Sequence, residues 1–175
     1  MARKKSASLY YDAWASAWGP IGAAAGEEGL TAFVLPSYAM DDLLQLLQWE
    51  HSGAQRDPEP FELLRQLTRD YFNARPADFS EVACSLPAES TFGGKVLRAC
   101  REMAYGETTS YSGLATRIGQ PEAARAVATI LSKNPTPLVV PCHRVLYKDG
   151  RLGGFSAAGG TDLKQRMLAL ESHRG

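Results

Sequence analysis

The chain has 175 residues, of which 45% are hydrophobic and 22% charged, an ordinary composition for a folded globular domain or two small ones. The chain has 19 basic and 19 acidic residues, so its formal net charge is zero, and it is neither a strongly basic nor a strongly acidic protein as a whole. The longest apolar run, residues 13–26, contains Pro20 and three glycines, which excludes a membrane span. The basic start MARKK leads into no apolar stretch, so we expect no signal peptide and predict a cytoplasmic protein.

The two halves of the chain carry opposite charge. Residues 1–89 hold 7 Lys and Arg against 13 Asp and Glu, whereas residues 90–175 hold 12 against 6. A basic second half favours contact with a polyanion such as a nucleic acid. An uneven but merely solvated surface explains the same count, so charge alone leaves both interpretations open.

Cysteine and histidine are few. The three cysteines form no CxxC pair, and the three histidines lack metal-ligand spacing, so we expect neither a disulfide framework nor a metal site. For Cys84 and Cys100 we expect inert burial.

Residues 1–86 are predicted to form a small α/β domain. Gly-rich turns separate apolar stretches typical of short strands, and a further stretch alternates in the same way. Two later stretches have helical spacing, with Asp41 and Pro60 near their starts. The expected strands are 9–14, 21–26, 30–36 and 78–86, and the expected helices are 40–50 and 60–75.

Residues 87–175 are predicted to form a mostly helical domain, joined to the first by residues 87–91. A short helix over 110–119, with Ser110 as its N-cap, ends at Gly119, and Pro121 begins the next. Two short helices joined by a tight glycine turn predict a helix-turn-helix. We therefore predict an α/β (α+β) fold. The other expected helices are 90–103, 121–134 and 161–172, the last capped by Thr161 or Asp162.

The helix after Pro121 has four alanines around Arg125, at positions 123, 124, 126 and 128. Alanine permits close packing against a neighbouring helix, which is the simpler interpretation. A smooth face that enters a narrow groove, with one long cation projecting from it, is the alternative that a helix-turn-helix favours.

The sequence PCHRV, residues 141–145, follows the apolar run PTPLVV, which we interpret as a buried strand. A cysteine reacts as its thiolate and so needs a proton acceptor. His143 is adjacent, but neighbours on a strand point to opposite faces, so a bridging water or a turn after Cys142 is required. Glu171 would orient the imidazole if the last helix folds back. An inert buried cysteine with two solvated neighbours is the other interpretation.

Residues 105–156 closely resemble the O6-alkylguanine-DNA alkyltransferase family, through ARAV, then NP, then PCHRV at this spacing. Residues 8–85 resemble its N-terminal domain more loosely. The resemblance implies repair of DNA by direct reversal. An O6-alkylguanine in double-stranded DNA is turned out of the duplex by a minor-groove helix-turn-helix, and its alkyl group passes irreversibly to Cys142. O4-alkylthymine is left open as a second substrate.

The resemblance also implies roles for individual residues. His143 takes the thiol proton through water, Glu171 orients it, and Asn134 is a hinge, although an asparagine that ends a helix is equally common. Tyr111 donates toward the extruded base, and Arg125 fills the vacancy in the stack. Arg144 is expected to pair with a carboxylate inside the fold. The implied DNA-binding residues are Arg125, Ala124, Ala126, Tyr111 and Ser110, and the implied pocket residues are Val145, Phe155, Ser156 and Ala157.

The chain departs from the family pattern at a few positions. Gly93 and Leu97 stand where a glutamine and an aromatic residue are usual, Phe155 replaces a frequent tyrosine, and the zinc ligands of some relatives have no match. We predict no cofactor, no metal and no membrane partner, and a monomer whose cooperativity on DNA is left open. A lesion-sensing DNA-binding protein without catalysis, or a Cys-His-Glu hydrolase, are the rival functions.

Overall fold

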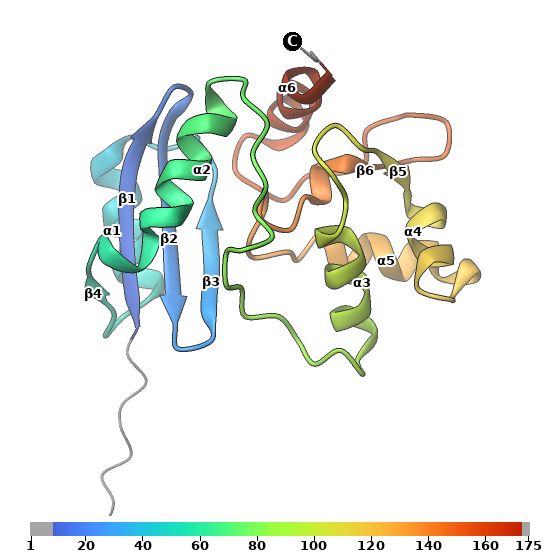
Figure 1. The fold of residues 1–175 in the computed structure, drawn as a ribbon, viewed down its shortest axis with the longest axis horizontal. Helices are drawn as coiled ribbons and strands as arrows, with labels where there is room; N and C mark the ends of the chain where they lie inside the picture. The colour runs from blue at the N-terminus through green and yellow to red at the C-terminus, as the bar shows by residue number, and fades with distance from the viewer. Residues whose placement is uncertain (1–8, 173–175) are drawn as a thin grey trace, which may run out of the picture.

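The computed structural model describes residues 9–172 (Figure 1). The MARKK segment and His173 lie outside the described residues. The first half forms a four-stranded sheet of order β3-β2-β1-β4. Strands β1 to β3 are antiparallel neighbours, and the short β4 pairs parallel to β1, with Tyr10 opposite Gln55. The strands are β1 (Tyr10–Ser16), β2 (Gly19–Gly26), β3 (Gly29–Val34) and β4 (Gln55–Arg56).

The sheet is covered on both faces, by α1 (Met40–Glu50) on one and α2 (Glu62–Phe72) on the other (Figure 1). Alternation along β1 explains this, because Ala13 packs in the cluster of Leu43 and Leu47 from α1, whereas Trp14 packs in the cluster that contains Leu64 from α2. The first three of the four predicted strands and both predicted helices of this half are confirmed. The short β4 is exposed and polar, and the sequence did not indicate it.

The predicted strand over 78–86 is wrong. Its only ladder contact among the described residues is a single bridge between Cys84 and Leu30 of β3, with Leu30 N donating to the Ala83 carbonyl at 2.8 Å. Phe79 and Val82 both enter the core cluster, and Val82 N donates to the Phe79 carbonyl. Two core residues three positions apart require a turn, which breaks the alternation that a strand needs.

The second half is mostly helical, and the helix-turn-helix is confirmed. The helix α4 (Tyr111–Arg117) is capped by Ser110, whose hydroxyl accepts from Gly113 N at 2.9 Å, and Gly119 follows with φ of 75°. A 3₁₀ turn (Pro121–Ala123) then leads into α5 (Ala124–Leu131), which is shorter than predicted. The third predicted helix, α3 (Phe92–Arg101), packs against both in one core cluster.

The last helix, α6 (Gly160–Ser172), begins one residue earlier than predicted. Thr161 and Asp162 therefore lie inside its first turn, and the prediction that one of them caps the helix is wrong. Within residues 9–172 no helix combines the length and apolar character needed to cross a membrane.

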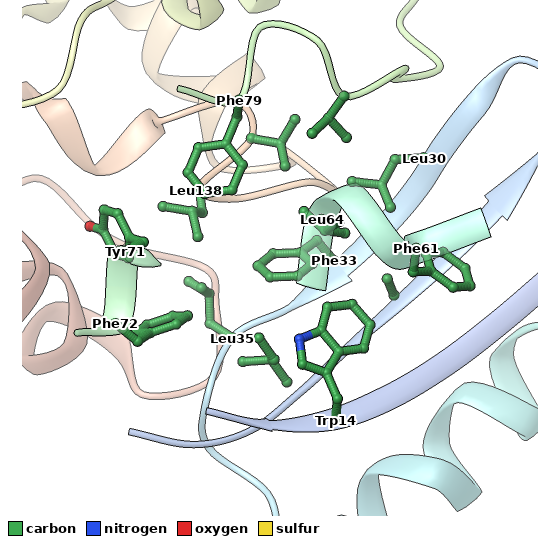
Figure 2. Packing of buried hydrophobic residues seen from close by; sticks show 14 of the residues in the cluster. Trp14, Leu30, Phe33, Leu35, Phe61, Leu64, Tyr71, Phe72, Phe79 and Leu138 are labelled. Atoms are coloured by element: carbon green, nitrogen blue, oxygen red, sulfur yellow. The ribbon is translucent and has the colours of Figure 1, made fainter. Parts of the chain in front are cut away.

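The two halves share a hydrophobic core. Leu138 from the second half packs in the same cluster as Phe33 and Trp14 (Figure 2), and Leu163 and Met167 of α6 also belong to it. The backbone N–H of Phe33 donates to the Pro135 carbonyl at 2.9 Å, which docks the segment before Cys142 on β3, the outer strand of the sheet. The boundary between residues 86 and 87 stays a prediction, and the core continues across it.

Candidate active site

Cys142 begins a short 3₁₀ turn, Cys142–Arg144, at the end of a buried segment. The strand expected for PTPLVV is wrong, because that segment contains only an isolated bridge between Pro137 and Val140. Prolines cannot donate to a ladder, and Leu138 adopts φ of 75°. The turn alternative is therefore what the structure has, and Cys142 and His143 do not lie on opposite faces of a strand.

Asn134 holds the sulfur. Its side-chain Nδ2 donates to Cys142 Sγ at 3.2 Å and to the Val140 carbonyl at 2.8 Å, while its Oδ1 accepts from Thr136 N at 3.1 Å. The left-handed conformation typical of an asparagine that ends a helix is not found at Asn134. Its amide instead joins the end of α5 to the turn that carries the thiol, which agrees with the hinge interpretation.

Glu171 lies at the centre of a buried hydrogen-bond network. His143 Nε2 is 2.6 Å from Glu171 Oε1, and Arg144 Nε donates to Glu171 Oε2 at 2.8 Å. His143 is 0% exposed and Glu171 2%. The last helix therefore does fold back, and the predicted pairing of Arg144 with an internal carboxylate is confirmed, on the same carboxylate that meets the imidazole. Tyr71 and the backbone of Gly106 complete its shell.

This shell sets the charge of the pair. Burial alone would raise the pKa of Glu171, but the hydrogen bonds and charges of His143 and Arg144 outweigh it and lower the pKa to about 2. Burial lowers the pKa of His143 below its ordinary value, against the opposing effect of Glu171. At neutral pH the carboxylate is thus charged and the imidazole neutral. His143 Nδ1 has no partner among the described protein atoms, so it is available to accept a proton.

The resting sulfur is a thiol. Burial raises the pKa of Cys142 above its ordinary value. The Asn134 amide, the Lys164 ammonium and the backbone N–H groups of Cys142 and His143 oppose that rise, and all of them favour the thiolate once it forms. The arrangement can therefore generate a nucleophile when a base removes the thiol proton, and the neutral imidazole of the adjacent residue, His143, is the candidate base.

Comparison with known proteins decides which family uses this arrangement. A family model, 6-O-methylguanine DNA methyltransferase, DNA binding domain, matches residues 91–173. The methylated-DNA–protein-cysteine methyltransferase of Methanosarcina barkeri is 36% identical over 168 residues, which cover 94% of this chain and 98% of that protein. The chain belongs to the methylated-DNA–protein-cysteine methyltransferase family.

Solved structures agree with this assignment. The crystal structure of the Mycobacterium tuberculosis O6-methylguanine methyltransferase is 30% identical, with a TM-score of 0.77, and the match covers 95% of this chain and 94% of that one. A structure of the Mycobacterium tuberculosis protein in complex with DNA matches equally well, at 32% identity. The resemblance, the fold class and DNA binding by the second half are thereby confirmed.

The methyltransferase fold brings Tyr111 to the same place as the thiol. Tyr111 is the first residue of α4, is 8% exposed, and belongs to the cluster that contains Cys142 and Val145. The parallel pairing of β5 (Thr109–Ser110) with β6 (Val145–Leu146) fixes the start of α4 beside the segment that follows the thiol. Burial, with Tyr147 and Cys142 nearby, raises the pKa of Tyr111 to about 12, so its hydroxyl stays a donor.

The remaining predicted residues divide between this cluster and the surface. Phe155 packs against both large core clusters, Ala157 is half-buried, and Ser156 is exposed. Arg125 and Ala126 lie exposed on α5, whereas Ala124 packs against the core. The close-packing interpretation therefore holds for the face with Ala124, and the groove interpretation stays a prediction for the exposed face with Arg125. The Arg125 side chain has no ion-pair or hydrogen-bond partner within the described part of the chain.

Sequence reasoning missed Lys164. It is 1% exposed, its Nζ donates to the Val145 carbonyl at 2.9 Å, and it lies 6.0 Å from the centre of the Tyr111 ring. Burial lowers the pKa of Lys164, and a thiolate at Cys142 or Cys100 would raise it. Its position beside Leu163 and three residues before Met167, both buried, was the available signal, because a lysine on a buried helical face needs a partner.

The other two cysteines lie outside the Asn134–Cys142 and His143–Glu171 hydrogen bonds. All three cysteines are free thiols, and Cys100 is buried as expected. Cys84 is only half-buried, which differs from the expectation, and its sulfur lies 3.5 Å from Thr136 Oγ1. Among residues 9–172 no cluster of His, Cys, Asp and Glu could hold a metal ion.

Proposed function

We propose that Cys142 is the acceptor in an irreversible transfer of one alkyl group from O6-alkylguanine in double-stranded DNA. The protein is a methylated-DNA–protein-cysteine methyltransferase, and what is proposed is the residues that carry the reaction. The observation that carries the proposal is a pair of hydrogen bonds on two adjacent residues, Asn134 to Cys142 and His143 to Glu171, which provide a positioned sulfur, a neutral base and a charged orienting group.

The chemical step balances without a cofactor. His143 Nδ1 takes the thiol proton, through a water molecule, and Glu171 stabilises the imidazolium that results. The thiolate attacks the alkyl carbon, so that an S–C bond forms as the C–O6 bond breaks. Negative charge then develops on the guanine, and Tyr111 donates a hydrogen bond toward it. The departing guanine takes up one proton from water and the imidazolium releases one, so that the thiol proton is replaced by the alkyl group overall. The thioether is stable, so each molecule reacts once.

The DNA-binding step uses the exposed face of α5. We place this helix in the minor groove, where Ala126 permits close approach and Arg125 enters the stack as the damaged base leaves it. Ser110, at the start of α4, lies on the same helix-turn-helix, although its hydroxyl already caps the helix. The free guanidinium of Arg125 and the exposed position of Ala126 support this placement.

The extruded base is received beside Val145, Phe155, Ser156 and Ala157. The Val145 carbonyl already accepts from Lys164, which orients it, and a carbonyl oxygen retains a second lone pair for the base. We place the protein in the cytoplasm, where cysteines stay reduced, and expect a monomer. O4-alkylthymine remains a second candidate substrate.

Intact-protein mass spectrometry after mixing with a duplex that contains O6-methylguanine tests the proposal. We expect one CH₂ group added per molecule, mapped to the peptide with Cys142, and no addition to Cys142→Ala. Because the groove contacts do not use the sulfur, Cys142→Ala should bind the duplex with unchanged affinity. Binding without transfer by the unmodified protein would favour a lesion sensor, and repeated turnover would favour a hydrolase. Methylation at Cys84 or Cys100 would contradict the assignment.

A further inference from the structure

Tyr71 reaches the candidate active site from the other half of the chain. It lies in α2, is 0% exposed, and its hydroxyl donates to Glu171 Oε1 at 2.8 Å. Figure 2 shows its ring at the edge of the hydrophobic cluster, with the hydroxyl oxygen pointing away from the other side chains. Its ring centre lies 5.2, 6.2 and 6.0 Å from the ring centres of Phe72, Phe79 and Tyr105, respectively. Aromatic packing on several sides therefore fixes where the hydroxyl lies.

The hydroxyl of Tyr71 shares an acceptor with the candidate base. Glu171 Oε1 also meets His143 Nε2 at 2.6 Å and Arg144 Nη2 at 3.1 Å, while Oε2 accepts from Arg144 Nε and Gly106 N. Each donor stabilises the charged carboxylate and makes it a weaker acceptor for the remaining ones. The strength with which Glu171 holds a proton on His143 thus depends on Tyr71.

We propose that Tyr71 is a positioning residue for alkyl transfer, which fixes Glu171 Oε1 against His143 and limits how strongly the carboxylate retains the imidazolium proton. The inference rests on the proposed function, because it places Tyr71 in the same relay. It gives the N-terminal half a direct part in the chemistry, through one hydrogen bond across the interface between the halves.

The charged and titratable groups around this pair come from four elements. They are Tyr71 from α2, Tyr105 from the loop after α3, Arg144 from the turn at Cys142, and Lys164 from α6. Removal of the Tyr71 hydroxyl leaves the two cations and Tyr105 in place and takes one donor from the carboxylate. Glu171 then attracts the His143 proton more strongly, so the pKa of His143 rises.

The test uses Tyr71→Phe in the full chain, with ¹⁵N-labelled histidine followed by NMR across pH. We expect the titration midpoint of His143 to move upward by about half a pH unit. This shift corresponds to only part of the free energy of one hydrogen bond to a charged group, because the other donors to Glu171 remain. The acid limb of the single-turnover transfer rate should move by the same amount, because only neutral His143 accepts the thiol proton. The rate above that limb should be retained.

Tyr105→Phe is the matched control. Tyr105 lies beside Tyr71, and its hydroxyl donates to the Leu170 carbonyl at 3.4 Å and not to the Glu171 carboxylate. In Tyr105→Phe the titration midpoint of His143 should equal that of the unmodified protein. Equal behaviour of the two variants, or a Tyr71→Phe rate lowered by one factor at every pH with an unmoved midpoint, would show that Tyr71 only packs.

A second variant tests the inference if Tyr71→Phe fails to fold. Replacement of Tyr71 by 3-fluorotyrosine keeps the ring and the hydroxyl but makes the hydroxyl a stronger donor, so the His143 midpoint should move downward. A midpoint that stays or rises would overturn the inference. Methylation of Cys142 in the unmodified protein is measured separately, so failure of the proposed function and failure of this inference give different results.

Discussion

The backbone of Gly153 lies directly against Tyr111, so closely that a Cβ atom on Gly153 would overlap with the Tyr111 hydroxyl oxygen. A side chain at this position must therefore displace the phenol from its place beside the thiol. Gly153 is required for steric reasons and not for conformational freedom, since its φ is not positive.

Gly153→Ala should slow alkyl transfer by about 10- to 100-fold, because a displacement on the order of 1 Å at a reacting site has effects of this size. Single-turnover kinetics with methylated duplex measure it. Gly154→Ala is the control, since a Cβ atom there meets nothing within 4 Å. In a Tyr111→Ala background the three atoms nearest to that Cβ, which are the hydroxyl oxygen and two ring carbons of Tyr111, are all gone, so Gly153→Ala should cost much less. Equal costs in both backgrounds would contradict the explanation.

His143→Gln should lower the transfer rate at pH 7 by about 10²- to 10⁴-fold, the usual contribution of a general base. Because burial raises the pKa of the Cys142 thiol, the variant has little thiolate at neutral pH. Its rate should recover as pH rises toward that pKa, when hydroxide removes the proton instead. Single-turnover rates between pH 6 and 10 test this. Cys142→Ala should show no transfer at any pH, and a pH-independent defect in His143→Gln would exclude the role of base.

Glu171→Gln should destabilise the fold by about 3 kcal/mol at pH 7, since the folded pKa is about 2 against an ordinary value of 4.5. A depressed carboxyl pKa contributes stability above pH 4.5 and loses it as pH falls toward 2. The difference in unfolding free energy between the two proteins should therefore narrow over that window. Urea titrations at several pH values measure it, and a difference that stays constant from pH 7 to 3 would contradict the assignment.

Arg125→Ala should slow transfer from a duplex far more than transfer from free O6-methylguanine base, because only the duplex has a vacancy to fill. Rates at saturating DNA separate this effect from weaker binding. Lys133→Ala is the control, since Lys133 is also an exposed cation that follows α5. Lys133→Ala should weaken DNA binding and lower its salt dependence by the equivalent of one phosphate contact. Its transfer rate at saturating DNA should show no loss specific to the duplex. Equal losses on both substrates would rule out insertion.

Elements with local signals were predicted correctly. The helix over 40–50, the Ser110 cap, the turn at Gly119 and the selective spacing around PCHRV each depend on neighbours within a few residues, so they were predictable. The strands expected over 78–86 and before Cys142 were wrong for the complementary reason. Phe79 and Val82 both turn into a core cluster that Leu138 of the other half of the chain completes, and Leu138 itself adopts φ of 75°, which interrupts the segment before Cys142.

The contacts among the reacting groups depend on packing between distant segments of the chain. Glu171 and Arg144 are separated by a loop and a helix, and Tyr71 lies a hundred residues before the carboxylate that it contacts. In the sequence Lys164 looks like an ordinary exposed lysine, and it is buried only because α6 packs against the segment that contains Val145. Hydrogen bonds and desolvation act over a few ångströms of space, and the sequence does not encode which distant side chains come that close. The nucleophile and its partners His143 and Glu171 were therefore predicted from the sequence motif and its family resemblance, whereas the contacts of Tyr71 and Lys164 were not.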